Sequence, residues 1–71
     1  MHFLKRSLVY LAEDYKITDY DGFSDYLFAN FPTEVWEVSD GLQYCYAEVA
    51  DKLAKEYLEY KSIVSNYEVI V

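Results

Sequence analysis

The fold of this chain is decided by residues 40–66, which read DGLQYCYAEVADKLAKEYLEYKSIVSN. Apolar residues recur there at steps of mostly four and three, the spacing that places side chains on one face of an α-helix. This stripe consists of Leu42, Tyr46, Val49, Leu53, Tyr57, Tyr60, Val64 and Tyr67, widened by Cys45, Ala50, Ala54 and Leu58. The spacing predicts one long helix from Asp40 to about Asn66, with Ser39 or Asp40 as its N-cap.

Two shorter helices are predicted before it. Residues 3–15 carry apolar side chains at helical spacing and form the first. Residues 23–31 form the second, which Asp21 or Ser24 could cap and which Pro32 stops, because proline excludes the helical conformation from the residue before it.

Two segments fit more than one structure. Residues 33–38 fit either a single helical turn or a short extended piece, and we favour the helical turn. Residues 67–71 are apolar and β-prone, so they either pack back on the core or add an edge strand to a partner. The predicted fold is therefore mainly α, or α+β if the tail forms a short C-terminal strand. Two short helices and an irregular segment pack on one long C-terminal helix, in a single domain of residues 1–71.

The composition of the chain indicates how its core is built and in which cellular compartment we expect it. A chain of 71 residues has a small core, and its nine tyrosines, four phenylalanines and one tryptophan compensate by burying large areas. Its single cysteine cannot form an internal disulfide, which is typical of a reducing compartment. No apolar run is long enough to span a membrane. We expect a soluble, unprocessed, cytoplasmic protein that does not contact membranes.

The residues needed for common enzyme chemistry are missing. His2 is the only histidine and lies at the terminus, and Cys45 lies beside the apolar stripe, which predicts a buried thiol. Asp19, Asp21 and Asp25 have the spacing of acids in a calcium loop, but the glycine and the last ligand of such a loop are not in place. A domain this small also has little room for a pocket of several hundred cubic ångströms. We expect no catalytic residue, no metal, no cofactor and no enzyme activity.

Charge is the most informative property of the chain. The net charge is −7, and residues 13–40 alone account for it, with eight acidic residues against one lysine. The long helix, in contrast, has charges four apart that can pair: Glu48 with Lys52, Asp51 with Lys55, and Lys55 with Glu59. Unpaired like charges cost stability, so their concentration in one segment indicates function.

The same acidic segment contains Tyr15, Tyr20, Tyr26 and Trp36, residue types common at protein interfaces. Spaced carboxylates interleaved with hydroxyls can imitate the phosphates of a nucleic acid and compete for a Lys/Arg surface. Alternatively, the aromatic residues complete the core and the acids only keep the protein soluble. The predicted partner-binding residues are Glu13, Asp14, Asp19, Tyr20, Asp21, Asp25, Tyr26, Glu34, Glu37 and Asp40.

One short motif carries a resemblance. Residues 19–23, Asp-Tyr-Asp-Gly-Phe, resemble the Asp-Tyr-Glu-Gly-Phe stretch of ArdA-type anti-restriction proteins, which are acidic mimics of DNA. The match covers five residues, and Ser24 stands where that stretch is usually followed by proline. The whole profile is also similar to phage-encoded inhibitors of restriction or CRISPR nucleases. The resemblance implies an anti-restriction or anti-CRISPR inhibitor in the host cytoplasm that binds the basic surface of a nuclease or CRISPR effector and no nucleic acid directly.

A second function class uses the long helix. In this alternative the protein is a structural or interaction protein, either a homodimer or an antitoxin-like regulatory subunit. Its interface is the end of the helix that carries Tyr57, Tyr60, Val64 and Tyr67.

Overall fold

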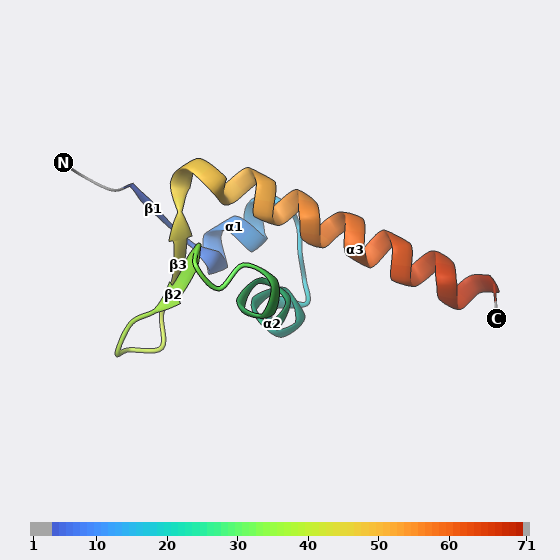
Figure 1. Ribbon diagram of the computed structural model, residues 1–71, viewed down its shortest axis with the longest axis horizontal. Coiled ribbons are helices and arrows are strands. Elements are labelled where there is room, and N and C mark those ends of the chain that lie inside the picture. Colours follow the sequence, from blue (N-terminus) through green and yellow to red (C-terminus); the bar gives the residue numbers. More distant parts are fainter. Residues whose placement is uncertain (1–3, 71) are drawn as a thin grey trace.

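The structure, a computed structural model, describes the chain from residue 4 to residue 70, and its side chains from residue 4 to residue 65. In chain order its elements are β1 (Lys5–Ser7), α1 (Leu8–Asp14), α2 (Tyr20–Asn30), β2 (Val35–Glu37), β3 (Gln43–Tyr46), the 3₁₀ turn η1 (Ala47–Val49) and α3 (Ala50–Ile70). The strands form an antiparallel sheet in the order β1-β3-β2. The helices lie on one side of this sheet, and α3 runs away from it (Figure 1).

The buried core lies between the sheet, α1, α2 and the first half of α3. Its side chains are Leu8, Leu11, Ala12, Phe23, Leu27, Val35, Cys45, Ala50, Leu53, Ala54 and Tyr57. The α3 members fall at helical spacing, which confirms the predicted apolar stripe from Ala50 to Tyr57. Between residues 58 and 65 the side chains of α3 are exposed or half-buried, and the helix projects from the body of a molecule that measures 49 × 23 × 21 Å.

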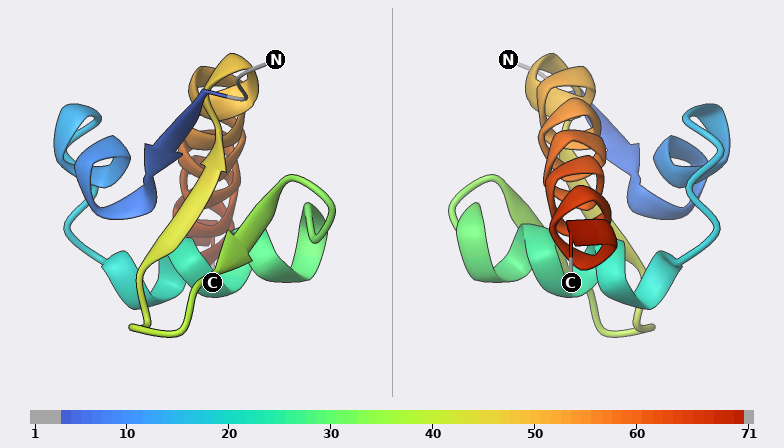
Figure 2. Two further views of the ribbon diagram at one scale, coloured as in Figure 1. Left: turned by 90° about the vertical axis from the view of Figure 1, so that its left-hand side faces the viewer. Right: turned by 90° about the vertical axis from the view of Figure 1, so that its right-hand side faces the viewer.

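The two faces of the sheet differ. Val35 and Cys45 are opposite each other on neighbouring strands, and both are buried under the helices. Trp36 is paired with Tyr44 on the other face, where their rings stack with centroids 6.2 Å apart. No helix covers this outer face in Figure 2.

The long helix begins at Ala50, so the prediction that it begins at Asp40 is wrong. Residues 43–46 form the central strand instead, because Tyr44 and Tyr46 also satisfy a period-two alternation around buried Cys45. Gly41 has a φ of +82°, which suits a turn between strands and not a helix start. The helix ends at Ile70, four residues beyond the predicted end.

Two further predictions of helix are wrong for the same reason. Residues 33–38 were expected to make a helical turn, but Val35–Glu37 is a strand paired with β3. Lys5–Ser7 is a strand on the other edge of β3, so the first helix begins only at Leu8. Both segments pair with the central strand β3, which supplies their backbone hydrogen-bond partners: β2 forms a hairpin with β3, and β1 pairs with it from far away in sequence.

The second helix is longer than predicted. It begins at Tyr20, and its cap is Asp19, whose side chain accepts a hydrogen bond from the backbone N–H of Gly22 at 3.1 Å. The predicted caps Asp21 and Ser24 lie inside the helix.

The end of α2 and the C-terminal residues were also predicted from the sequence. The helix ends at Asn30, one residue before the predicted end at Phe31, and it stops before Pro32 as predicted. Residues 67–70 continue α3, so the alternative with a C-terminal strand is wrong, and Val71 lies outside the described residues. The fold is a mixed α+β arrangement dominated by helix. In the described part of the chain, no helix is both long and apolar enough to cross a membrane.

Candidate binding site between α2 and α3

A groove of about 400 Å³ lies between α2 and the middle of α3. It is open to solvent, and α2 runs across α3 at this point (Figure 2). The lining residues are Asp19, Gly22, Asp25, Tyr26, Ala29 and Asn30 from α2 and its cap, and Tyr57, Tyr60, Lys61 and Val64 from α3. The expectation that so small a domain lacks room for a pocket of this size is therefore wrong.

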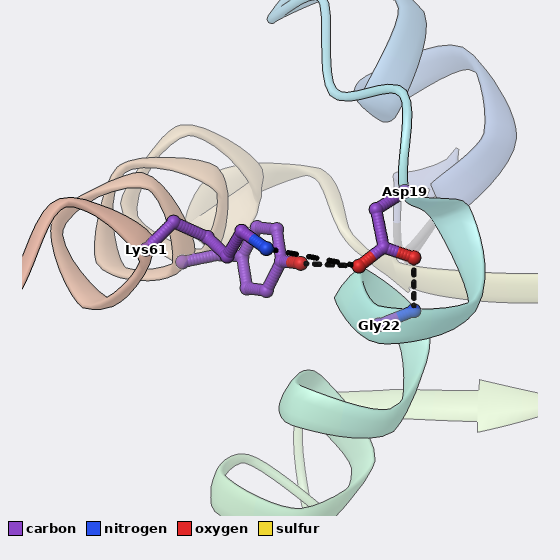
Figure 3. Close-up of polar contacts among 4 residues, drawn as sticks. Asp19, Gly22 and Lys61 are labelled. Atoms are coloured by element: carbon purple, nitrogen blue, oxygen red, sulfur yellow. Dashed lines mark hydrogen bonds and ion pairs between the residues drawn. The ribbon is translucent and has the colours of Figure 1, made fainter. Parts of the chain in front are cut away.

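The carboxylate of Asp19 joins the two helices at the groove (Figure 3). One oxygen accepts the hydrogen bond from Gly22, and the other accepts one from the hydroxyl of Tyr57 at 3.3 Å. The ammonium of Lys61 lies 3.9 Å from the same second oxygen. Burial and then the charge of Asp19 raise the pKa of Tyr57, which keeps this hydroxyl protonated. Asp19 is thus occupied by contacts within the protein.

Gly22 is required by this arrangement. A Cβ atom on Gly22 would lie 2.2 Å from an oxygen of Asp19 and 2.9 Å from the hydroxyl oxygen of Tyr57. With a Cβ at this position the carboxylate of Asp19 and the hydroxyl of Tyr57 would have to move, so glycine preserves the present cap and helix contact.

Tyrosine rings form one wall of the groove. Tyr26 stacks on Tyr60 with ring centroids 4.7 Å apart and packs against Tyr57 at 5.5 Å. Burial raises the pKa of Tyr26, and the carboxylates of Glu56 and Glu59 raise it further. Acidic side chains of α3 therefore lie near the aromatic wall.

Asp25 lies in the groove lining without a partner. It is exposed, as is Asp21 one helical turn earlier, and within residues 4–65 neither side chain takes part in a hydrogen bond or ion pair. Like charges four residues apart on a helix repel each other at a cost of roughly 0.2–0.5 kcal/mol. Two carboxylates on α2 thus face solvent, and no basic side chain among the described residues pairs with their negative charges.

A second polar cluster connects α2 to the sheet through Gln43. The hydroxyls of Tyr20 and Ser24 donate to its carbonyl oxygen at 2.6 and 2.8 Å, and its amide donates to Glu37 at 3.3 Å. Burial raises the pKa of Tyr20, and the charges of Asp21 and Glu37 add to the increase. Asp21 and Glu37 therefore approach the same tyrosine from separate elements.

The structure divides the ten predicted partner-binding residues. Those that line the groove are Asp19, Asp25 and Tyr26. Those gathered around Gln43 are Tyr20, Asp21 and Glu37.

The other four predicted residues do not join either group. Asp14, on α1, forms an ion pair with Arg6, and Glu13 is exposed on the same helix. Glu34 lies in the turn before β2, where one carboxylate oxygen is buried without a hydrogen bond. Asp40 is exposed in the turn between β2 and β3. The ten predicted residues therefore come from several elements, and some of them are engaged by contacts within the protein.

Three charge pairs were predicted along the long helix: Glu48 with Lys52, Asp51 with Lys55, and Lys55 with Glu59. None of them is among the ion pairs that the structure contains within residues 4–65. Asp51 instead accepts a hydrogen bond from the hydroxyl of Tyr15 at 2.7 Å. The ammonium of Lys52 lies over the ring of Phe31, 5.7 Å from its centroid. The acidic segment therefore interacts with the long helix, which the sequence pattern did not indicate.

Sequence reasoning missed several groove residues, among them Gly22, Ala29 and Lys61. A signal for them exists: positions 22, 25, 26 and 29 of α2 share one face, and this face carries small and polar residues where packing would favour apolar ones. The aromatic outer face of the sheet was also missed, although Trp36 and Tyr44 alternate with buried neighbours.

The described residues contain no group of three or more His, Cys, Asp or Glu side chains able to hold a metal ion. Cys45 is buried, as predicted, and burial raises its pKa to about 11, so the thiol is neutral and inert at ordinary pH.

Comparison with known proteins identifies no relative: the chain matches no family model, no curated protein and no solved structure. Arguments about function therefore start from its own residues.

Proposed function

We propose that this protein inhibits a nucleic-acid-binding host defence enzyme, of the restriction or CRISPR type, by occupying its basic surface. The inhibitor acts in the cytoplasm of the host cell and needs neither turnover nor a cofactor. The observation that carries the proposal is the uncompensated pair Asp21 and Asp25 on the solvent side of α2. With Glu37, which shares Tyr20 with Asp21, this pair defines the α2 acidic face.

Electrostatics favour this kind of partner. A net charge of −7 repels nucleic acid and attracts basic protein surfaces. Complementary charge accelerates association and selects partners more than it adds affinity. A basic surface that normally binds phosphates is the natural counterpart of carboxylates carried on a rigid helix.

The test is inhibition of DNA cleavage by a panel of purified restriction and CRISPR nucleases. The informative variant is Asp21→Lys with Asp25→Lys, because both side chains are exposed and unpaired. Asp19 is left unchanged because it caps α2. The matched control is Glu13→Lys with Glu48→Lys, which changes net charge equally but lies outside the α2 acidic face.

We expect the wild type and the control to inhibit at least one nuclease, and the α2 variant to lose inhibition while its circular dichroism spectrum is unchanged. The proposal is wrong if no nuclease in the panel is inhibited. It is also wrong if the folded α2 variant inhibits as well as the wild type.

A second candidate is a homodimer or regulatory subunit that uses the projecting half of α3. Its support is the apolar exposure there: Leu58 is 39%, Tyr60 44% and Ile63 58% exposed. Sedimentation at several protein concentrations distinguishes the two. A tight dimer that persists in high salt favours this candidate, and a monomer favours the inhibitor.

A further inference from the structure

The groove between α2 and α3 has a lining that selects one kind of ligand. Its volume of about 400 Å³ is at the small end of the range of roughly 300–1,000 Å³ for ligand sites. Ala29, one of the α2 residues in the lining, has a small side chain that takes up little of this space. The room suits a single long side chain better than a folded element.

The charges around the groove favour a cation. Asp25 is unpartnered, while Glu56 and Glu59 lie close enough to Tyr26 to raise its pKa. Lys61 is the one basic residue in the lining, and it lies beside Asp19, not Asp25. An anionic ligand would meet these carboxylates, and a neutral apolar ligand would leave Asp25 without a partner.

The aromatic wall distinguishes between cations. Tyr26, Tyr60 and Asp25 all line the groove, so one ligand can meet both aromatic rings and a carboxylate there. A guanidinium group is planar, stacks on aromatic rings and can donate two hydrogen bonds to one carboxylate. An ammonium group is a more strongly hydrated point charge and gains less from the same surfaces.

We infer that this groove binds an arginine side chain of the basic partner, with its guanidinium on Asp25 and against the rings of Tyr26 and Tyr60. The inference rests on the proposed function for the identity of the partner, because the groove adjoins the α2 acidic face through Asp25. It makes arginine, rather than positive charge in general, the recognised feature.

The experiment is an NMR titration of isotope-labelled protein with two short peptides that differ only in carrying arginine or lysine between glycines. The variants are Asp25→Asn, Tyr60→Ala and, as a matched control, Asp40→Asn. Asp25, Tyr60 and Asp40 are all exposed, so we expect each variant to fold. The NMR spectrum of each variant checks this directly.

We expect saturable shifts at residues 25–30 and 57–64 with the arginine peptide, and binding several-fold weaker with the lysine peptide. Asp25→Asn should weaken arginine binding about tenfold, the loss of one charge-assisted hydrogen bond, and Asp40→Asn should leave it unchanged. Shifts spread equally over all acidic residues, equal affinity for both peptides, or no effect of Asp25→Asn would each overturn the inference.

The inference and the proposed function fail separately. If nucleases are inhibited by the wild type and equally by Tyr60→Ala, and the arginine peptide does not bind, the arginine site is wrong and the inhibitor proposal stands. If the arginine peptide binds as expected and no nuclease is inhibited, the arginine site stands and the inhibitor proposal is wrong.

Discussion

The hydroxyl of Tyr57 donates a hydrogen bond to the carboxylate of Asp19 at 3.3 Å and so fixes the start of α2 against the middle of α3. Tyr57 is buried, and its ring also packs against Phe23 with centroids 5.2 Å apart. This contact sets the crossing of the two helices, and the groove opens beside it.

A double-mutant cycle tests this contact. Tyr57→Phe removes the hydroxyl, and Asp19→Asn removes the charge while keeping an oxygen for the cap. Each change should lower the free energy of unfolding by about 0.5–1.5 kcal/mol. In urea melts the two losses should be coupled by at least about 0.5 kcal/mol, because residues in contact are not additive. Simple additivity would mean that the hydrogen bond contributes nothing to stability.

Gly22→Ala should destabilise the protein. Elsewhere in a helix alanine is favoured over glycine by about 1 kcal/mol, so the ordinary expectation has the opposite sign. Here the added Cβ meets Asp19 and Tyr57 well inside contact distance. We expect a loss of about 1–3 kcal/mol by chemical denaturation, the range for overpacking a filled site. A stabilised Gly22→Ala variant would contradict the geometry of the Asp19 cap.

Gly41 is the matched comparison, because its constraint is conformational and not steric. Nothing lies within 4 Å of a Cβ at this position, but its φ of +82° is unfavourable for residues with a side chain. Gly41→Ala should cost about 1 kcal/mol. Gly41→Asn should cost less, because asparagine tolerates positive φ better. Equal losses for the two variants would show that the turn does not keep this conformation.

Stability should fall at alkaline pH, and Cys45 should be the first contributor. Burial raises the pKa of this thiol from 9.0 to about 11, so the folded state retains a proton that the unfolded state loses. The stabilisation is complete below pH 9.0 and is lost as the pH rises through about 11, by roughly 2–3 kcal/mol in total.

The control for this prediction is Cys45→Ala, which removes the titrating group. The variant will be less stable at neutral pH, because the substitution opens a cavity in the core. Between pH 9.0 and about 11, however, its unfolding free energy should fall less steeply than that of the wild type. Parallel curves would rule out ionisation of Cys45 as a cause.

The predictable part of the fold is the local part. Leu53 and Tyr57 are four residues apart and face the core, so spacing alone identifies their helix. Tyr44 and Tyr46 fit both a helical stripe and a strand alternation. What decides between them is pairing with β1 and β2. Val35–Glu37 forms a hairpin with β3 across a turn that contains Asp40 and Gly41, a residue pair typical of hairpin turns. Only the pairing with Lys5–Ser7 joins segments that are distant in sequence, and no local pattern shows it.

The candidate site was predictable to a similar extent. The acidic residues of α2 are evident from composition, and Asp21 and Asp25 do face solvent. Asp14 and Asp19, in contrast, are engaged by Arg6 and by Tyr57, and Tyr57 is distant from Asp19 in sequence. Only the folded arrangement separates acids with a structural role from acids that are free for a partner.

Salt dependence is the most direct test of the claim that the α2 acidic face binds a basic partner. The measurement is the Kd for an inhibited nuclease between about 0.05 and 0.5 M salt, for the wild type, Asp21→Lys with Asp25→Lys, and Glu13→Lys with Glu48→Lys. We predict that the Kd of the wild type and of the control rises at least about tenfold over this range, whereas the α2 variant binds weakly throughout. A wild-type Kd that does not change with salt, or an α2 variant that follows the wild-type curve, would contradict the account.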